Sequence, residues 1–311
     1  MAKDWIQGAT YYLFESHGAN VVYAAELGMH NYKTVNILVS EGHQGIGKST
    51  YAFNIMRAGA VKARLTSVGA ITELNRLYKR WVEAREKCGD CEEAQATWQE
   101  LAETLRKELN RIGVTCWGAY CEEPDSFDKK YIVPYIFTTD ATAEEFLARI
   151  KDIVEKKAEP LPRAFVDDYA VYRDVYLSGG LERKVYVELK KLFQYRRAFS
   201  RIFVATALTR VSVMKELLRT SVVIDAAQGD NSNTVVFTRW VLRNAFGGYV
   251  DGAKAYRMYK FLGWRDVVRV GEAFAAPRWL DDLMMARKRE AVKTAAERAL
   301  EALRAAKNSW F

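Results

Sequence analysis

The chain has 311 residues, a formal net charge of +8, and hydrophobic side chains at half of its positions. This composition excludes an intrinsically disordered protein, and the length allows one large domain or a core with an elaboration. No apolar run approaches the roughly 18 residues that a membrane span needs, and residues 1–5 lack the apolar centre of a signal peptide. We therefore expect a cytoplasmic protein without a membrane span.

The positive charge is concentrated in the last quarter of the chain. Residues 239–311 contain 15 Lys and Arg against 8 Asp and Glu, a net charge of +7. A basic terminal region of this kind favours DNA or another polyanion as a partner. Ordinary solubilising surface charge explains the same excess equally well, so both interpretations remain open.

The first segment, residues 4–27, is predicted to be helical. Its helical spacing places several aromatic side chains on one face: Trp5, Tyr11, Tyr12, Phe14 and Tyr23. Core packing is the simpler explanation of this face, and proximity to a nucleotide base is the alternative.

The motif G-x-x-x-x-G-K-[ST] occupies residues 42–49, from Gly42 to Ser49. The β-branched run 35–39 before it predicts a strand, and residues 51–61 after it predict a helix. The glycines allow backbone N–H groups to point at phosphate oxygens, and the helix adds the positive end of its dipole. The motif therefore predicts a nucleoside-triphosphate site, rather than a glycine-rich turn that happens to end in Lys-Ser.

The residue types of this motif also predict the ligand contacts. We expect Lys48 to reach the β- and γ-phosphates and the Ser49 hydroxyl to bind Mg²⁺. The residues expected to surround the phosphates are Gly42, His43, Gln44, Gly45, Ile46, Gly47, Lys48, Ser49 and Thr50.

Two helical runs, residues 70–87 and 92–112, predict a helical hairpin that forms an insertion over about residues 69–129. The four cysteines lie in or beside it: Cys88, Cys91, Cys116 and Cys121. Their spacing suggests zinc, but a continuous second helix would separate the two pairs by about 30 Å. We therefore favour two local disulfides, Cys88–Cys91 and Cys116–Cys121, or free thiols. Zinc stays open if that helix is broken or if dimerisation unites the pairs.

Downstream, predicted strands at residues 130–139, 163–168, 201–207 and 221–226 alternate with helices at about 141–157, 180–195 and 213–219. This order predicts an α/β core, residues 1–232, with a parallel sheet covered by helices on both faces. Residues 233–311 are expected to add a small antiparallel meander of three strands (234–243, 255–262 and 266–270) and a basic helix that ends near Lys307.

Polar side chains end two of these strands. Asp167 is expected to hold Mg²⁺ through water, opposite Ser49, and Asp168 to orient or activate an attacking water. Thr206 would sense the γ-phosphate or that water. The alternatives are an Asp pair that only caps its strand and a Thr that only satisfies backbone groups.

Short stretches of the sequence resemble AAA+ ATPases. Residues 205–207 followed by 214–219 are similar to the stretch from sensor 1 to the arginine finger. Residues 137–139, 143–146 and 165–168 resemble the corresponding stretch of replication-initiator and helicase-loader ATPases. The resemblance covers about residues 35–226 and is interrupted by the hairpin. A helical lid with a sensor-2 Arg is not apparent, and a lidless P-loop ATPase from an archaeal plasmid or virus fits as well.

This resemblance implies a RecA/AAA+-like P-loop core that hydrolyses ATP with Mg²⁺ as a homo-oligomer. Arg219 would then be the trans-acting arginine, with Arg210 as a second candidate, and a surface Arg is the alternative for both. An N-K-x-D guanine-reading motif is absent, so ATP is preferred over GTP.

Together with the basic C-terminal region, the resemblance predicts a role in DNA replication or mobile-element maintenance. The alternatives are a ring-forming DNA-packaging or secretion motor, and a nucleotide-dependent switch with little turnover. The hairpin is a candidate surface for a protein partner.

Overall fold

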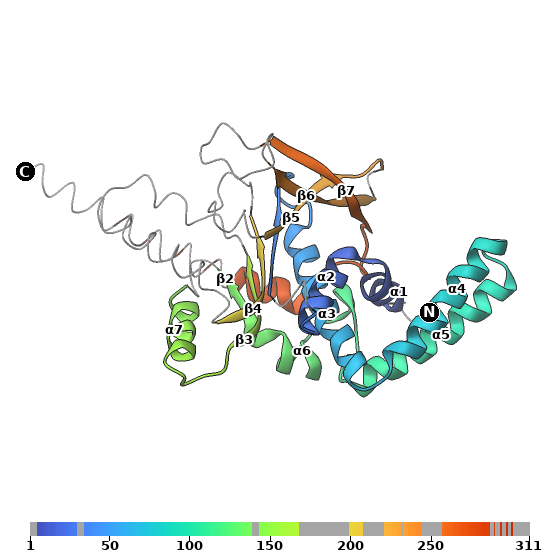
Figure 1. Ribbon diagram of the computed structural model, residues 1–311, viewed down its shortest axis with the longest axis horizontal. Coiled ribbons are helices and arrows are strands. Elements are labelled where there is room, and N and C mark those ends of the chain that lie inside the picture. The colour runs from blue at the N-terminus through green and yellow to red at the C-terminus, as the bar shows by residue number, and fades with distance from the viewer. Residues whose placement is uncertain are drawn as a thin grey trace, which may run out of the picture.

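The computed structural model describes residues 5–29, 34–138, 143–167, 199–207, 221–231, 233–243 and 257–286, and the single positions 289, 293, 297 and 300. These residues form an α/β structure around one seven-stranded, mostly parallel sheet (Figure 1). The strand order is β2-β3-β4-β1-β5-β6-β7. The strands are β1 (Val35–Ser40), β2 (Ile136–Thr138), β3 (Leu161–Asp167), β4 (Ser200–Thr206), β5 (Ser221–Gln228), β6 (Thr234–Arg243) and β7 (Arg257–Arg269).

The five strands from β2 to β5 pair in parallel. Every residue of β1 is buried, and β3 and β4 are buried along most of their length. Parallel strands covered on both faces read as continuous apolar runs. This explains why the sequence pattern located β1, β3, β4 and β5 to within a few residues.

The prediction of a separate three-stranded meander is wrong, because the structure has two strands in its place. β6 and β7 are two long antiparallel strands that extend the main sheet beyond β5. Gly263, which falls between the strands expected at 255–262 and 266–270, lies within β7. The pairing register between β6 and β7 shifts between Thr238 and Trp240, opposite the part of β7 that contains Gly263. A glycine inside a strand commonly marks such a bulge.

The strand expected at residues 130–139 is also shorter than predicted. Helix α6 (Ser126–Tyr131) and a 3₁₀ turn (Val133–Tyr135) precede β2, which contains only Ile136–Thr138. Pro134 lacks the N–H that a strand ladder needs, and its fixed φ suits the 3₁₀ turn. Helix α7 (Ala143–Val154) follows β2. The helices expected at 180–195 and 213–219 lie outside the described residues, and the C-terminal helix is described over residues 278–286.

The N-terminal segment forms helix α1 (Ile6–Thr10), the π-helical turn η1 (Tyr11–Glu15) and helix α2 (His17–Glu26). The chain is extended at Ser16, whose side chain accepts the Ala19 N–H as the N-cap of α2. Tyr12 is fully buried, and Trp5 and Phe14 pack against the same core. Core packing therefore accounts for this part of the aromatic face.

Helices α4 (Ile71–Cys88) and α5 (Glu92–Arg111) form the expected hairpin, which projects from the rest of the molecule (Figure 1). Disulfides join Cys88 to Cys91 at its tip and Cys116 to Cys121 beyond the other end of α5. Among the described residues, no three His, Cys, Asp or Glu side chains are grouped to hold a metal ion. The two local disulfides confirm the first of the interpretations favoured above.

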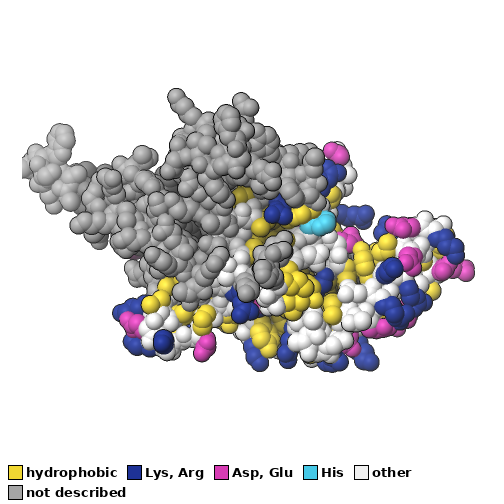
Figure 2. Space-filling model, viewed as in Figure 1, with side chains coloured by type: hydrophobic (Ala, Val, Ile, Leu, Met, Phe, Trp, Pro, Cys, Tyr) yellow, Lys and Arg dark blue, Asp and Glu magenta, His cyan; other side chains and the backbone are white. Residues whose placement is uncertain are grey.

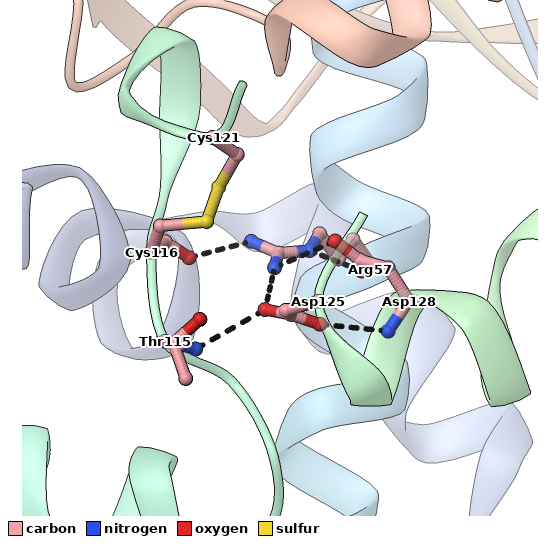
Figure 3. The surroundings of a disulfide bond; sticks show 6 residues. All are labelled: Arg57, Thr115, Cys116, Cys121, Asp125 and Asp128. Carbon is pink, nitrogen blue, oxygen red and sulfur yellow. Dashed lines mark hydrogen bonds and ion pairs between the residues drawn. A yellow bond between two sulfur atoms is a disulfide. The ribbon is translucent and has the colours of Figure 1, made fainter. Parts of the chain in front are cut away.

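Helix α3 (Lys48–Ser67) passes through the core and carries a fully buried arginine. Arg57 binds both carboxylate oxygens of Asp128 and one oxygen of Asp125, and donates to the carbonyl of Cys116 (Figure 3). The Trp117 ring lies 4.5 Å from its guanidinium carbon. These contacts attach the segment that follows the hairpin to α3. No described helix is long and apolar enough to cross a membrane.

Candidate functional site

The glycine-rich loop (residues 42–49) connects β1 to α3 at the carboxyl edge of the parallel strands. Gly42, Gly45 and Gly47 have φ values of 75°, 85° and 94°, and Glu41 has a φ of 63°. Side chains other than glycine rarely adopt this left-handed region. A Cβ on Gly42 would also lie 2.6 Å from the carbonyl oxygen of Ala226. The loop therefore needs glycine both for its backbone path and for its approach to β5.

The start of α3 is suited to an anion. Gly47 occupies the N-cap and has no side chain to accept a hydrogen bond from the first turn. Such a helix end presents N–H groups and the positive end of the helix dipole. The Lys48 ammonium group donates to the carbonyls of Gly42 and His43, at 3.2 Å each. Positive charge and N–H donors therefore lie within one loop.

Ser49, Asp167 and Thr206 meet beside this loop. The Ser49 hydroxyl donates to Oδ1 of Asp167 at 2.5 Å, and the Thr206 hydroxyl donates to the same oxygen at 2.6 Å. Asp167 and Thr206 are buried, whereas Ser49 is half-buried. The three side chains come from α3, β3 and β4. Because β4 lies between β1 and β3, Thr206 reaches the position between the loop and Asp167.

The sheet order identifies this edge as a binding region by a second route. After β1 the chain goes to β2 at one edge of the sheet, whereas after β4 it goes to β5 on the other side of β1. In open α/β sheets, ligands bind outside the carboxyl ends of strands at such a topological switch point. The crevice between β1 and β4 is where the Ser49–Asp167–Thr206 cluster lies.

Asp225 is a further carboxylate near this edge that the sequence interpretation did not single out. It pairs in register with Ser40, the last residue of β1, and the Ser40 hydroxyl lies 3.5 Å from its Oδ1. The sequence could have indicated Asp225, because an acid near the end of a β-branched run is the same pattern that identified Asp167.

Asp266 is a buried acid that local sequence gave no reason to expect. Its carboxylate accepts hydrogen bonds from the Ser16 hydroxyl, the His17 and Gly18 N–H groups and the Tyr51 hydroxyl, at 2.6 to 3.1 Å. Tyr51 lies in the first turn of α3. Burial and the neighbouring Asp266 charge raise the pKa of the Tyr51 phenol well above its ordinary value. Asp266 therefore joins β7 and the start of α2 to the helix that follows the glycine-rich loop.

Three residues expected at this site, Asp168, Arg210 and Arg219, lie outside the described residues, so their roles stay predictions. No family model matches the chain, and no curated protein matches it either. The function of the site is therefore inferred from its own geometry and chemistry.

Proposed function

We propose that this protein is a RecA/AAA+-like P-loop ATPase that binds ATP and Mg²⁺ at the glycine-rich loop and hydrolyses the nucleotide. One observation carries the proposal. A glycine-rich loop that opens a long helix lies directly beside a carboxylate, Asp167, that accepts hydrogen bonds from Ser49 and Thr206. Phosphate binding and metal binding require these two elements side by side.

The chemistry of the donors fits both ligands. Mg²⁺ prefers oxygen ligands, and the Ser49 hydroxyl and the Asp167 carboxylate supply them. The magnesium ion, when bound there, would neutralise charge that develops on the phosphate oxygens. Lys48 would exchange its bonds to the Gly42 and His43 carbonyls for phosphate oxygens, and the helix N-terminus would add its N–H groups.

The remaining residues take positioning roles in this proposal. Thr206 donates to the Asp167 carboxylate from the β4 side and would sense the γ-phosphate or the attacking water. Asp168 would orient or activate the attacking water. Arg219, or Arg210 in its place, would act on the site of a neighbouring subunit, which makes the active form a homo-oligomer.

We further propose that hydrolysis is coupled to DNA replication or mobile-element maintenance. The support is the net charge of +7 over residues 239–311 and the resemblance to replication ATPases. Salt-dependent DNA binding by the full chain tests this part, because each phosphate contact contributes about 0.9 to the slope of log affinity against log salt. Replacing Arg287, Lys288 and Arg289 by Ala should reduce that slope. A DNA affinity that does not change with salt concentration would contradict this part of the proposal.

Phosphate release from Mg²⁺-ATP tests the hydrolytic part. We expect Lys48→Ala to abolish ATP binding, and Asp167→Asn to lower turnover about 100-fold or more. Lys79→Ala is the matched control, because Lys79 is an exposed lysine on α4 that forms an ion pair with Glu83 on the same helix. A protein that binds no ATP, or a Lys48→Ala variant with wild-type turnover, would overturn the proposal. Turnover that does not change with DNA would leave an ATPase but remove the coupling to DNA.

A further inference from the structure

We propose a second nucleotide site in the cleft between the helical hairpin and the N-terminal helices, suited to a mononucleotide. The cleft has a volume of about 810 Å³, within the usual range for small-molecule sites of about 300–1,000 Å³. Its walls come from α1, η1, α4, α5, the paired ends of β6 and β7, and Phe274. No lining residue comes from the glycine-rich loop, β3 or β4. This site is therefore separate from the one proposed for ATP hydrolysis.

Aromatic rings line two sides of the cleft. Trp81 and Trp98 line the hairpin side, with ring centroids 5.0 Å apart, and both are half-buried. Tyr11 and Phe274 lie on the other side as an edge-to-face pair at 5.7 Å. Aromatic faces in a groove provide stacking surfaces for a nucleobase and tolerate different bases.

Two arginines supply the charge for a phosphate. Arg85 and Arg269 both line the cleft, and the Arg85 guanidinium carbon lies 5.5 Å from the centre of the Trp81 ring. Arginine binds phosphate through paired N–H donors and also stacks on aromatic rings. Elsewhere on the hairpin, basic and acidic side chains are interspersed (Figure 2), as in the Arg80–Glu100 ion pair. The two arginines thus act locally and are not part of a broad basic surface.

The charge balance favours one nucleotide over a nucleic-acid strand. Glu15 and Asp90 line the same cleft as the two arginines. Their carboxylates would repel the successive phosphates of a strand. The charges of Arg85 and Arg269 also act on Glu15, where they oppose the rise in pKa that burial causes.

Calorimetric titration of full-length Lys48→Ala protein with AMP, GMP, CMP and UMP tests the proposal. The Lys48→Ala variant is expected to lose nucleotide binding at the glycine-rich loop, so the titration reports on the cleft. If the loop binds no nucleotide, the variant should bind monophosphates as the wild type does. We expect binding of at least one monophosphate, weakened about tenfold or more by Trp98→Leu and by Arg269→Gln. Arg80→Gln is the matched control on the same hairpin and should bind like the parent variant. Adenosine and inorganic phosphate, each carrying half of the recognised chemistry, should bind more weakly than the nucleotide.

Several outcomes would overturn the proposal. One is that no monophosphate binds the Lys48→Ala protein. Another is that Trp98→Leu and Arg269→Gln bind as tightly as Arg80→Gln. A third is that inorganic phosphate binds as tightly as the nucleotides, because the aromatic walls would then play no part. Trp81→Leu, on the same wall of the cleft, provides a further arm if Trp98→Leu does not fold, and it should also weaken binding. Failure of ATP turnover in the wild type would leave these titrations unaffected, so the two proposals fail separately.

Discussion

The Arg57 guanidinium and the Asp128 carboxylate form a fully buried two-point ion pair, with Nε–Oδ1 at 2.7 Å and Nη2–Oδ2 at 3.0 Å. Burial raises the pKa of Asp128, and the Arg57 charge opposes that shift. Arg57→Met would leave two acids, Asp125 and Asp128, without their cation. We expect a loss of about 3–5 kcal/mol in the free energy of unfolding, measured by urea denaturation.

The exposed ion pair between Arg76 and Glu73 is the control for this measurement. Because both side chains are half exposed, Arg76→Met should change stability by less than about 1 kcal/mol. An Arg57→Met variant that loses no more than the control would show that packing around the side chain compensates for the lost pair.

The Cys116–Cys121 disulfide is expected to matter more than Cys88–Cys91. Chain entropy predicts about 2 kcal/mol for either short loop, so a difference must come from the folded state. Cys121 is buried and the Cys116 carbonyl accepts from Arg57, whereas Cys88 and Cys91 lie at the hairpin tip. We expect the double Ala variant at positions 116 and 121 to melt at a clearly lower temperature than the double variant at 88 and 91. Equal melting temperatures would contradict this.

Thr206→Val tests whether the threonine positions Asp167. The substitution keeps the side-chain shape but removes the hydroxyl that donates at 2.6 Å. A hydrogen bond to a charged group contributes about 1.5–3 kcal/mol, so ATP turnover should fall about tenfold to a hundredfold while ATP binding changes little. Thr206→Ser keeps the donor and should restore most of the turnover. Wild-type turnover in the Val variant would show that Thr206 only satisfies backbone groups at the end of β4.

Tyr51→Phe tests the link between β7 and the start of α3. It removes a hydroxyl that donates to Asp266 at 2.6 Å inside the core, and the expected loss of stability is about 1.5–3 kcal/mol. Tyr23→Phe is the matched control, since the Tyr23 hydroxyl forms a partly buried hydrogen bond with the neutral Thr66 hydroxyl. Its loss should be about 1 kcal/mol, and equal losses for the two variants would contradict a special role of the Asp266 charge.

Lys62 gives a pH dependence of stability. Burial lowers its pKa from 10.5 to about 8, although its ammonium donates to Oδ1 of Asn20 and lies over the Tyr23 ring. Between these two pKa values the unfolded chain binds more protons than the folded chain, so stability rises with pH. From about pH 7.5 to about pH 9.5, the free energy of unfolding of the wild type should rise by about 2 kcal/mol relative to Lys62→Met.

Lys79→Met, at an exposed position of α4, should show no such difference from the wild type. The titration is best ended below pH 10. Above that pH, Tyr51 keeps its proton in the folded state but loses it in the unfolded chain, so stability falls with pH instead of rising. A parallel pH response of wild type and Lys62→Met would exclude an unusual titration of Lys62.

Local sequence determined the parts of this protein that depend on neighbours along the chain. The glycines at 42, 45 and 47 predicted a tight loop between a strand and a helix. The left-handed backbone found at all three fits that prediction, because no other residue adopts this path so readily. Helical spacing predicted α4 and α5, and the length of α5 separated the cysteine pairs as expected. Local patterns failed where a proline or glycine had a second role, at Pro134 before β2 and at Gly263 within β7.

Tertiary structure decided which distant residues meet. The sequence suggested Asp167 and Thr206 as strand-end polar residues, but their shared contact with Ser49 depends on β4 lying between β1 and β3. Apolar strands of similar composition do not encode their lateral order, which is set by how the connecting helices pack. The role of Asp266 and the hairpin cleft could not be predicted from the sequence for the same reason. Each is made by segments that are far apart in the chain, and only the packed fold brings their charges and rings together.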